Sequence, residues 1–151
     1  MSRPKGFTKT RKLRFADCDP AGIGFYPRLV EQVNNTVEDW FEDAIGLSFH
    51  EMHMKRDIGV PTRSLSVDFS TPAMLGELID WNLNVIELRR SLIALQVHAH
   101  GPGGNRILSA KVNLVWCEFS GKTPKSQPIP EEIRNKMLPF ISPVEKGIHA
   151  N

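Results

Sequence analysis

Residues 15–27 read Phe-Ala-Asp-Cys-Asp-Pro-Ala-Gly-Ile-Gly-Phe-Tyr-Pro, with two acids, Asp17 and Asp19, separated by one residue. An alternating apolar segment precedes the acids, a Pro-Ala-Gly turn follows them, and a long amphipathic pattern then begins. This order predicts a strand, a turn and a helix. It places a carboxylate beside the first backbone N–H groups of the helix, which carry partial positive charge and lack intrahelical partners. A carbonyl oxygen held by such N–H groups, with a carboxylate near its carbon, suits acyl chemistry.

A structural interpretation of the same residues competes with this one. Aspartate is a favoured N-cap residue, and proline is favoured at the first position of a helix. On this interpretation Asp19 and Pro20 only begin the helix.

The segment also resembles the signature of the hotdog-fold acyl-CoA thioesterases of the 4-hydroxybenzoyl-CoA type. That family carries Asp-x-Asp-x-x-Gly, a short apolar run, and then Tyr-Pro or Tyr-His at the start of its central helix. The resemblance extends over about residues 10–120 and includes the family's second-strand pattern, although only the first motif is highly specific. The matching residues are Asp17, Asp19, Gly22, Tyr26 and Pro27, followed by Val67-Asp68-Phe69, Pro72-Ala73 and Gly76-Glu77.

The resemblance implies roles for individual residues. Asp19 would be the catalytic carboxylate, acting as nucleophile or general base, and the backbone N–H of Tyr26 would polarise the thioester carbonyl. Gly22 and Gly24 would let substrate approach the backbone closely, and Phe25 would line the substrate site. Asp17 would be structural.

The sequence identifies the residues that bind substrate less specifically than the catalytic motif. Arg89 and Arg90 fall where the family often has basic residues for coenzyme A phosphates, to which arginine binds well. A solvated pair at a turn is the alternative for these two residues. Gly24 and Phe25 replace a bulkier pair in the family, and no residue matches a phenol-binding group. The choice between aryl and aliphatic acyl groups therefore stays open.

Composition excludes several classes of protein. The length of 151 residues predicts one domain over residues 1–151, and the net charge of +2 argues against a nucleic-acid partner. No apolar run is long enough to span a membrane. Met1–Lys5 is basic, but no apolar segment follows it, so we expect no signal peptide and a cytoplasmic protein. Two cysteines set no disulfide framework.

Hydrophobic periodicity predicts an α+β fold. We expect a first strand at about 7–15, a long helix over 28–45 stopped by Gly46, a short helix begun by Ser48 and Glu51, and a C-terminal helix near 131–138. Strict alternation predicts four further strands. The last of them has apolar residues on both faces near its end, which indicates cover on both sides. With the resemblance, this is an antiparallel sheet wrapped around one long central helix. The alternating residues lie within 65–69, 79–85, 93–99 and 108–116.

For the other reactive side chains, a packed or surface role fits better than catalysis or metal binding. Two flanking carboxylates would raise the pKa of Cys18, which favours a small packed residue over a nucleophile. His50 and His53 lack the spacing of a zincin motif, and His98 and His100 share a strand face without a third metal ligand. We expect no metal.

These observations lead to an acyl-CoA thioesterase that needs no cofactor. The resemblance implies a homodimer or a dimer of dimers with its pocket between subunits. The alternatives are a thioesterase for acyl-carrier protein, which a basic pocket mouth would favour, and a non-catalytic acyl-CoA-binding module.

Overall fold

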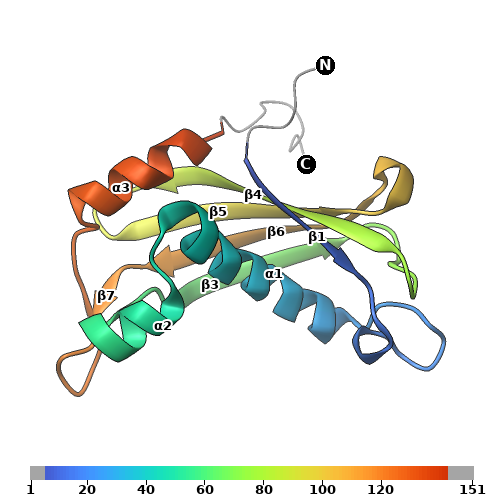
Figure 1. The fold of residues 1–151 in the computed structure, drawn as a ribbon, viewed down its shortest axis with the longest axis horizontal. Helices are drawn as coiled ribbons and strands as arrows, with labels where there is room; N and C mark the ends of the chain where they lie inside the picture. Colours follow the sequence, from blue (N-terminus) through green and yellow to red (C-terminus); the bar gives the residue numbers. More distant parts are fainter. Residues whose placement is uncertain (1–5, 143–151) are drawn as a thin grey trace.

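The computed structural model describes residues 6–142, so the basic segment Met1–Lys5 lies outside the described residues. Its centre is a five-stranded antiparallel sheet ordered β1-β4-β5-β6-β3, which curves around the long helix α1 (Figure 1). The strands are β1 (Phe7–Lys12), β3 (Thr62–Phe69), β4 (Leu78–Leu88), β5 (Leu92–His100) and β6 (Arg106–Val115), and α1 is Tyr26–Trp40. The expected α+β architecture is confirmed.

Smaller elements close one end of the molecule. A second sheet joins β2 (Ile58–Gly59), β7 (Cys117–Glu118) and β8 (Lys125–Ser126), and the short helices are α2 (Phe49–Glu51) and α3 (Glu131–Met137). Ser48 caps α2 by accepting a hydrogen bond from the Glu51 N–H, as its sequence predicted. None of the described helices is long and apolar enough to cross a bilayer.

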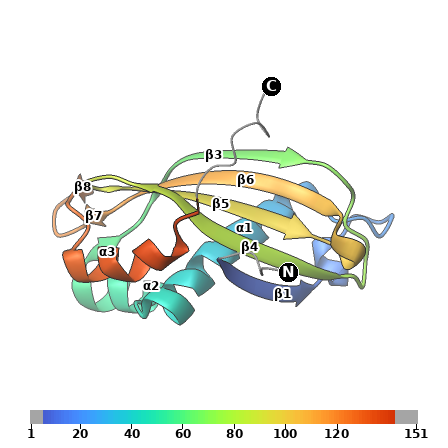
Figure 2. The same ribbon diagram turned by 90° about the horizontal axis from the view of Figure 1, so that it is seen from above.

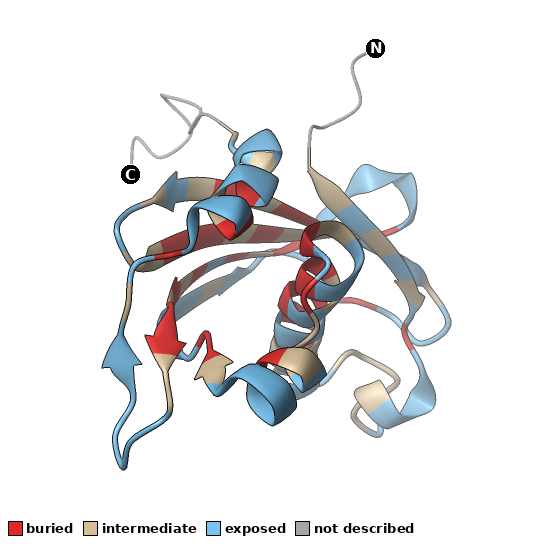
Figure 3. Cartoon of the chain, turned by 60° about the vertical axis from the view of Figure 1, so that its left-hand side comes forward, coloured by how far each residue is buried: buried red, intermediate tan, exposed pale blue. Residues whose placement is uncertain are grey.

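The core forms where one flank of α1 meets the concave face of the sheet (Figure 3). The helix continues through a π-helical turn, Phe41–Ile45, and ends at Gly46, whose φ of 78° is the left-handed conformation expected of a C-terminal glycine. Alternate residues of β4, β5 and β6 face the helix and are almost fully buried. Helix and sheet residues in this core include Leu29, Val33, Val37, Trp40, Leu83, Leu95, Val97 and Ala110.

The expected first strand is too long. β1 ends at Lys12, and Phe15–Asp17 forms a 3-10 turn. The Asp17 carboxylate accepts a hydrogen bond from the Arg14 N–H, and the Asp17 N–H donates to the Arg14 carbonyl. These local bonds turn the chain out of the sheet before the two acids. The last strand also ends earlier than expected, since Cys117 joins the second sheet.

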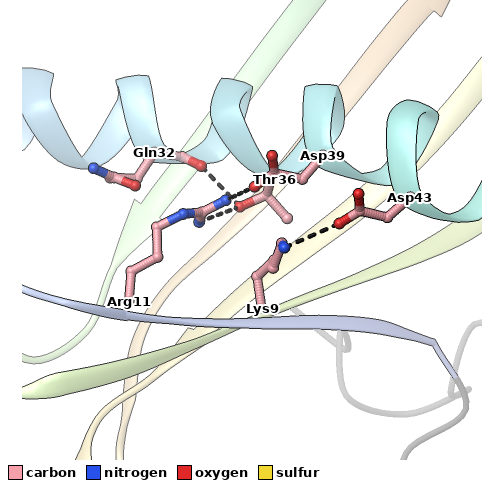
Figure 4. Close-up of polar contacts among 6 residues, drawn as sticks. All are labelled: Lys9, Arg11, Gln32, Thr36, Asp39 and Asp43. Carbon is pink, nitrogen blue, oxygen red and sulfur yellow. Dashed lines mark hydrogen bonds and ion pairs between the residues drawn. The ribbon is translucent and has the colours of Figure 1, made fainter. Parts of the chain in front are cut away.

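Polar contacts fix β1 against α1 (Figure 4). The Arg11 guanidinium forms an ion pair with Asp39 and donates to the Thr36 hydroxyl, and Thr36 donates in turn to the Gln32 carbonyl. Lys9 pairs with Asp43 one turn further along the helix. Only about a fifth of the Arg11 side chain is exposed, whereas two-fifths of Lys9 is.

Strand β3 occupies one edge of the sheet (Figure 2). It pairs with β6 only, and nearly all of its residues are exposed. Leu65 and Phe69 lie in register with the buried residues Val112 and Leu108, so they face the helix side, yet both remain more than two-fifths exposed. An apolar sheet edge is therefore uncovered in the single chain.

We predict that Arg11→Leu lowers the free energy of unfolding by about 1–3 kcal/mol, because it leaves Asp39 and Thr36 without their partly buried partner. Lys9→Leu, which breaks the more exposed pair, should cost less than about 1 kcal/mol. Urea denaturation followed by circular dichroism measures both. Equal losses in the two variants would contradict the assigned role of Arg11.

Candidate active site

The segment 17–25 folds back on itself between β1 and α1. Two backbone hydrogen bonds join its arms, from the Phe25 N–H to the Asp17 carbonyl at 2.8 Å and from the Asp19 N–H to the Ile23 carbonyl at 2.9 Å. The connection after β3 is fixed to this loop, because the Gly24 N–H donates to the Ala73 carbonyl at 2.8 Å. The loop that carries the sequence motif is thus held from two sides.

Asp19 uses one carboxylate oxygen to hold the loop. Its Oδ1 accepts hydrogen bonds from the N–H groups of Ala21, at 2.9 Å, and Ile23, at 3.2 Å. Within the described chain, Oδ2 accepts no hydrogen bond. The side chain is partly buried. The carboxylate is therefore anchored through one oxygen and free to act through the other.

The helix α1 begins without a capping side chain. Its N-cap residue is Phe25, and Asp19 closes a separate turn several residues earlier, so the interpretation of Asp19 as the cap of this helix is wrong. The N–H groups of Arg28 and Leu29 donate to the Phe25 carbonyl. The N–H of Tyr26 donates to no oxygen among residues 6–142. A donor at the positive end of a fifteen-residue helix is therefore available to a ligand.

A pocket of about 250 Å³ opens beside this donor. Tyr26 and Gly24 line it from the loop, and Phe69 lines it from the end of β3. The rings of Phe25, Tyr26 and Phe69 form an edge-to-face series with centroids 5.7 and 6.3 Å apart. The remaining lining residues are Leu29, Ser70, Thr71, Pro72 and Ala73.

The two predicted glycines differ in their surroundings. Gly22 has a φ of 78°, which gives it a conformational role of its own in the turn. Gly24 has ordinary backbone and lines the pocket, and a Cβ there would lie 3.4 Å from Ala73 and Leu29. Gly24 is thus the one of the two whose missing side chain adds space beside Tyr26.

The structure also separates the roles of Asp17 and Cys18. Asp17 holds the 3-10 turn, in agreement with a structural role. β1 ends at Lys12, so neither Cys18 nor Asp19 lies on that strand. Burial, followed by the charges of Asp17 and Asp19, raises the pKa of the Cys18 thiol, which disfavours a thiolate.

Arg89 and Arg90 lie away from this loop in the single chain. They follow the C-terminal end of β4, whereas the loop adjoins its N-terminal end through the bond from the Leu13 N–H to the Glu77 carbonyl. Eleven residues of strand separate the two ends, a span of about 35 Å. Both arginines are exposed, and Arg89 pairs with Glu87 at 3.1 Å. One chain does not bring them together with Asp19.

Residues 13–137 match the thioesterase-like superfamily, more than four-fifths of the chain. The chain belongs to this superfamily. A 1,4-dihydroxy-2-naphthoyl-CoA hydrolase of Synechocystis is 27% identical over 81 residues, a match that covers 54% of this chain and 58% of that enzyme.

Solved structures place this thioesterase-superfamily chain among hotdog folds. The 1,4-dihydroxy-2-naphthoyl-CoA thioesterase of Synechocystis superposes with a TM-score of 0.79 at 20% identity, over 87% of this chain and 95% of the other. The 4-hydroxybenzoyl-CoA thioesterase of a Pseudomonas strain has a TM-score of 0.76 at 23% identity, over 87% and 99%. The predicted wrapping of the sheet around the helix is confirmed.

Sequence reasoning missed part of the pocket. The sequence marks Phe69 and Ala73 as part of a strand pattern, and neither they nor Ser70 and Thr71 are predicted to line the site. Only the fold showed that the connection after β3 forms a wall beside Tyr26.

The histidines form no metal centre among the described residues. His50 and His53 are exposed, whereas His98 and His100 are partly buried on the outer face of the sheet with ring centroids 6.0 Å apart. Burial, assisted by the charges of Arg106 and His100, lowers the pKa of His98 to about 4.

We predict that stability falls as the pH drops from about 6.5 to about 4, since there the unfolded chain binds a proton at His98 that the folded chain does not. The shift corresponds to at most about 3 kcal/mol. His98→Gln should flatten this part of the profile. Urea denaturation at a series of pH values measures the slope, and identical profiles for wild type and His98→Gln would contradict the prediction.

Proposed function

We propose that this chain is a thioester hydrolase that cleaves an acyl-CoA to the free acid and coenzyme A. The observation that carries the proposal is the unpartnered N–H of Tyr26, a pocket residue at the start of α1, together with a carboxylate that the preceding loop anchors through one oxygen. A backbone donor at a helix start is suited to an oxyanion, and a carboxylate supplies a nucleophile or a base. Such an arrangement matches acyl transfer better than binding alone.

The same residues support two routes for the reaction. The Asp19 carboxylate attacks the thioester carbon to form an anhydride, which water then hydrolyses, or it removes a proton from the water that attacks. In both cases the carbonyl oxygen gains negative charge and accepts the Tyr26 N–H bond, and the thiolate of coenzyme A leaves. A carboxylate, a backbone donor and water suffice, so the proposal includes no cofactor or metal.

The pocket supports an aryl or short acyl group as substrate. It is small and bordered by the Tyr26 and Phe69 rings, which pack well against a flat ring. The similar proteins act on 1,4-dihydroxy-2-naphthoyl-CoA and 4-hydroxybenzoyl-CoA, both aromatic thioesters. Cys18 and Cys117 are free thiols, which agrees with a reducing compartment such as the cytoplasm.

One feature supports an acyl-carrier-protein substrate as the second candidate. Lys12 and Arg14 are exposed at a hollow of about 540 Å³ on the other flank of α1, next to Asp17. A basic surface near the active loop would attract an acidic carrier protein. Thiol release from matched acyl-CoA and acyl-carrier-protein substrates distinguishes the two candidates, and binding without thiol release would favour the non-catalytic alternative.

We further propose a homodimer, and a tetramer as its assembled form. The exposed edge strand β3 offers unpaired backbone groups, and Leu65 and Phe69 add apolar surface on its helix-facing side. Two copies joined through β3 would run antiparallel about a two-fold axis. The end of one sheet that carries Arg89 and Arg90 would then lie toward the end of the other that carries Asp19. One subunit would then bind the coenzyme A phosphates through Arg89 and Arg90, and the other would cleave the thioester at Asp19.

We predict that Asp19→Asn lowers kcat by at least about 100-fold, because the amide is neither nucleophile nor base. Its oxygen still accepts the Ala21 and Ile23 bonds, so the fold and coenzyme A binding should survive. Asp17→Asn is the matched control, expected to lose stability more than turnover. A normal kcat in Asp19→Asn together with an inactive Asp17→Asn would show that the other carboxylate is catalytic.

The Arg89→Ala/Arg90→Ala double variant is expected to raise KM for acyl-CoA more than it lowers kcat, since remote phosphate contacts bind ground state and transition state alike. The dependence of KM on salt should also weaken. An acyl-pantetheine thioester, which lacks the nucleotide, is the control substrate and should respond little. An unchanged KM for acyl-CoA would identify the pair as a solvated turn.

Light scattering should give a mass of at least twice the 17.0 kDa of one chain. Leu65→Lys, which places a charge on the exposed helix-facing side of β3, should shift the mass toward the monomer and reduce activity in parallel. A fully active monomer at the same concentration would refute the shared pocket.

A further inference from the structure

The turn that carries Arg89 and Arg90 is attached to the segment that follows the last long strand. The Arg89 N–H donates to the Leu92 carbonyl at 2.9 Å, which closes the turn between β4 and β5. The Arg90 carbonyl accepts the N–H of Ile129 at 2.8 Å, and Ile129 is buried. The backbone of this turn is therefore fixed to the body of the protein, although both arginine side chains are exposed.

Arg134 of α3 adds a side-chain contact to this attachment. Its Nη2 donates to the Arg89 carbonyl at 2.6 Å and to the Arg90 carbonyl at 3.4 Å, so one guanidinium spans two successive carbonyls of the turn. The helix α3 lies beside the ends of β4 and β5 that this turn joins (Figure 1), and its residues Ile133 and Met137 are buried. The guanidinium therefore contacts the turn from a helix that is itself anchored in the core.

The partners of Arg134 are neutral. None of the carboxylates of residues 6–142 forms an ion pair with it, whereas Lys136 of the same helix pairs with Glu132. A planar guanidinium suits two neighbouring carbonyls, because its donors point in fixed directions and can reach both at once. Carbonyl partners also add no negative charge, so the contact fixes the turn without adding an anion that would repel a phosphate.

We propose that Arg134 is a positioning residue for coenzyme A, because it holds the turn between β4 and β5 so that Arg89 and Arg90 are preorganised for the phosphates. The inference rests on the proposed function, in which these two arginines bind those phosphates. Groups that are fixed before a ligand arrives lose less conformational freedom on binding it, and they bind it more tightly. Loss of Arg134 would loosen the turn and weaken coenzyme A binding, with no direct effect on the chemistry at Asp19.

Isothermal titration calorimetry with coenzyme A and steady-state kinetics with benzoyl-CoA test this. Arg134→Met keeps an unbranched apolar stem and removes the donors. It should weaken coenzyme A binding and raise KM about three- to tenfold, the size of one lost hydrogen bond, and change kcat less than about twofold. KM for benzoyl-pantetheine, which lacks the nucleotide, should stay the same. Arg134→Lys keeps a donor and should restore part of the affinity.

Lys136→Met is the matched control, because it removes a cation of the same helix that pairs with Glu132 and not with the turn. It should leave coenzyme A affinity and KM at their wild-type values. Thermal unfolding of each variant records any loss of stability separately. An Arg134→Met variant that is less stable but binds coenzyme A as the wild type does would overturn the inference and make Arg134 a stabilising contact only.

A double-mutant cycle separates positioning from direct contact with the phosphate. If Arg134 acts through the turn, Arg134→Met should lower kcat/KM for benzoyl-CoA less than about twofold in the Arg89→Ala/Arg90→Ala background, because the groups that it positions are gone. Equal losses in the two backgrounds would overturn the positioning role and show that Arg134 acts on the substrate independently of the pair.

The results also distinguish this inference from the proposed function. A chain that releases thiol from acyl-CoA with a KM that does not depend on Arg134 keeps the function and refutes the inference. A chain that binds coenzyme A in a manner dependent on Arg134 but releases no thiol keeps the inference and refutes the hydrolysis. A chain that neither binds coenzyme A nor releases thiol refutes both.

Discussion

The fold depends on the burial of one flank of a single helix against one face of an antiparallel sheet. The sheet curves around the apolar side chains of this helix, because its concave face is the surface against which they pack. These side chains are Trp40, the buried leucine and valine residues of α1, and Phe41 of the following turn. One helix covers only part of such a sheet. The cover ends before β3, and that leaves a strand edge and two large apolar side chains exposed where a second copy would join.

The candidate site follows from how the chain enters this helix. A capping side chain satisfies the N–H of the second or third helical residue, and the first N–H keeps no partner within the helix. Here the acids cap other turns, Asp17 the 3-10 turn and Asp19 the loop. In α1 the second residue is Pro27 and the Arg28 N–H donates to the Phe25 carbonyl, so Tyr26, the first residue, is the one with an available N–H. The same hydrogen bonds that fix Asp19 through Oδ1 leave Oδ2 free. Asp19 therefore holds the loop with one oxygen, Oδ1, and keeps the other, Oδ2, for the proposed reaction.

The cations proposed to bind substrate lie apart from the pocket within one chain. The pocket itself holds no charged side chain, and the cations proposed for coenzyme A, Arg89 and Arg90, lie at the far end of the sheet. In the proposed antiparallel dimer through β3, the far end of one sheet would lie toward the loop of the other. Cation positions that are unrelated to the pocket within one chain would then converge on a single extended substrate.

The sequence by itself determined the elements and the reactive loop. Alternation predicted the four long strands, spacing predicted the helix to Ile45, and the motif at Asp17–Tyr26 identified the loop, because periodicity and turn chemistry are local properties. The alternation of apolar residues predicted a first strand that is too long. The hydrogen bond from the Arg14 N–H to the Asp17 carboxylate ends the strand early, and apolar alternation does not reveal such a bond. Tertiary structure alone decided that residues 69–73 wall the pocket, that Arg89 and Arg90 follow the end of β4 opposite to the one that adjoins the loop of Asp19, and that β3 is uncovered. Those facts depend on strand order and register, which bring together residues far apart in sequence, and no local pattern encodes them.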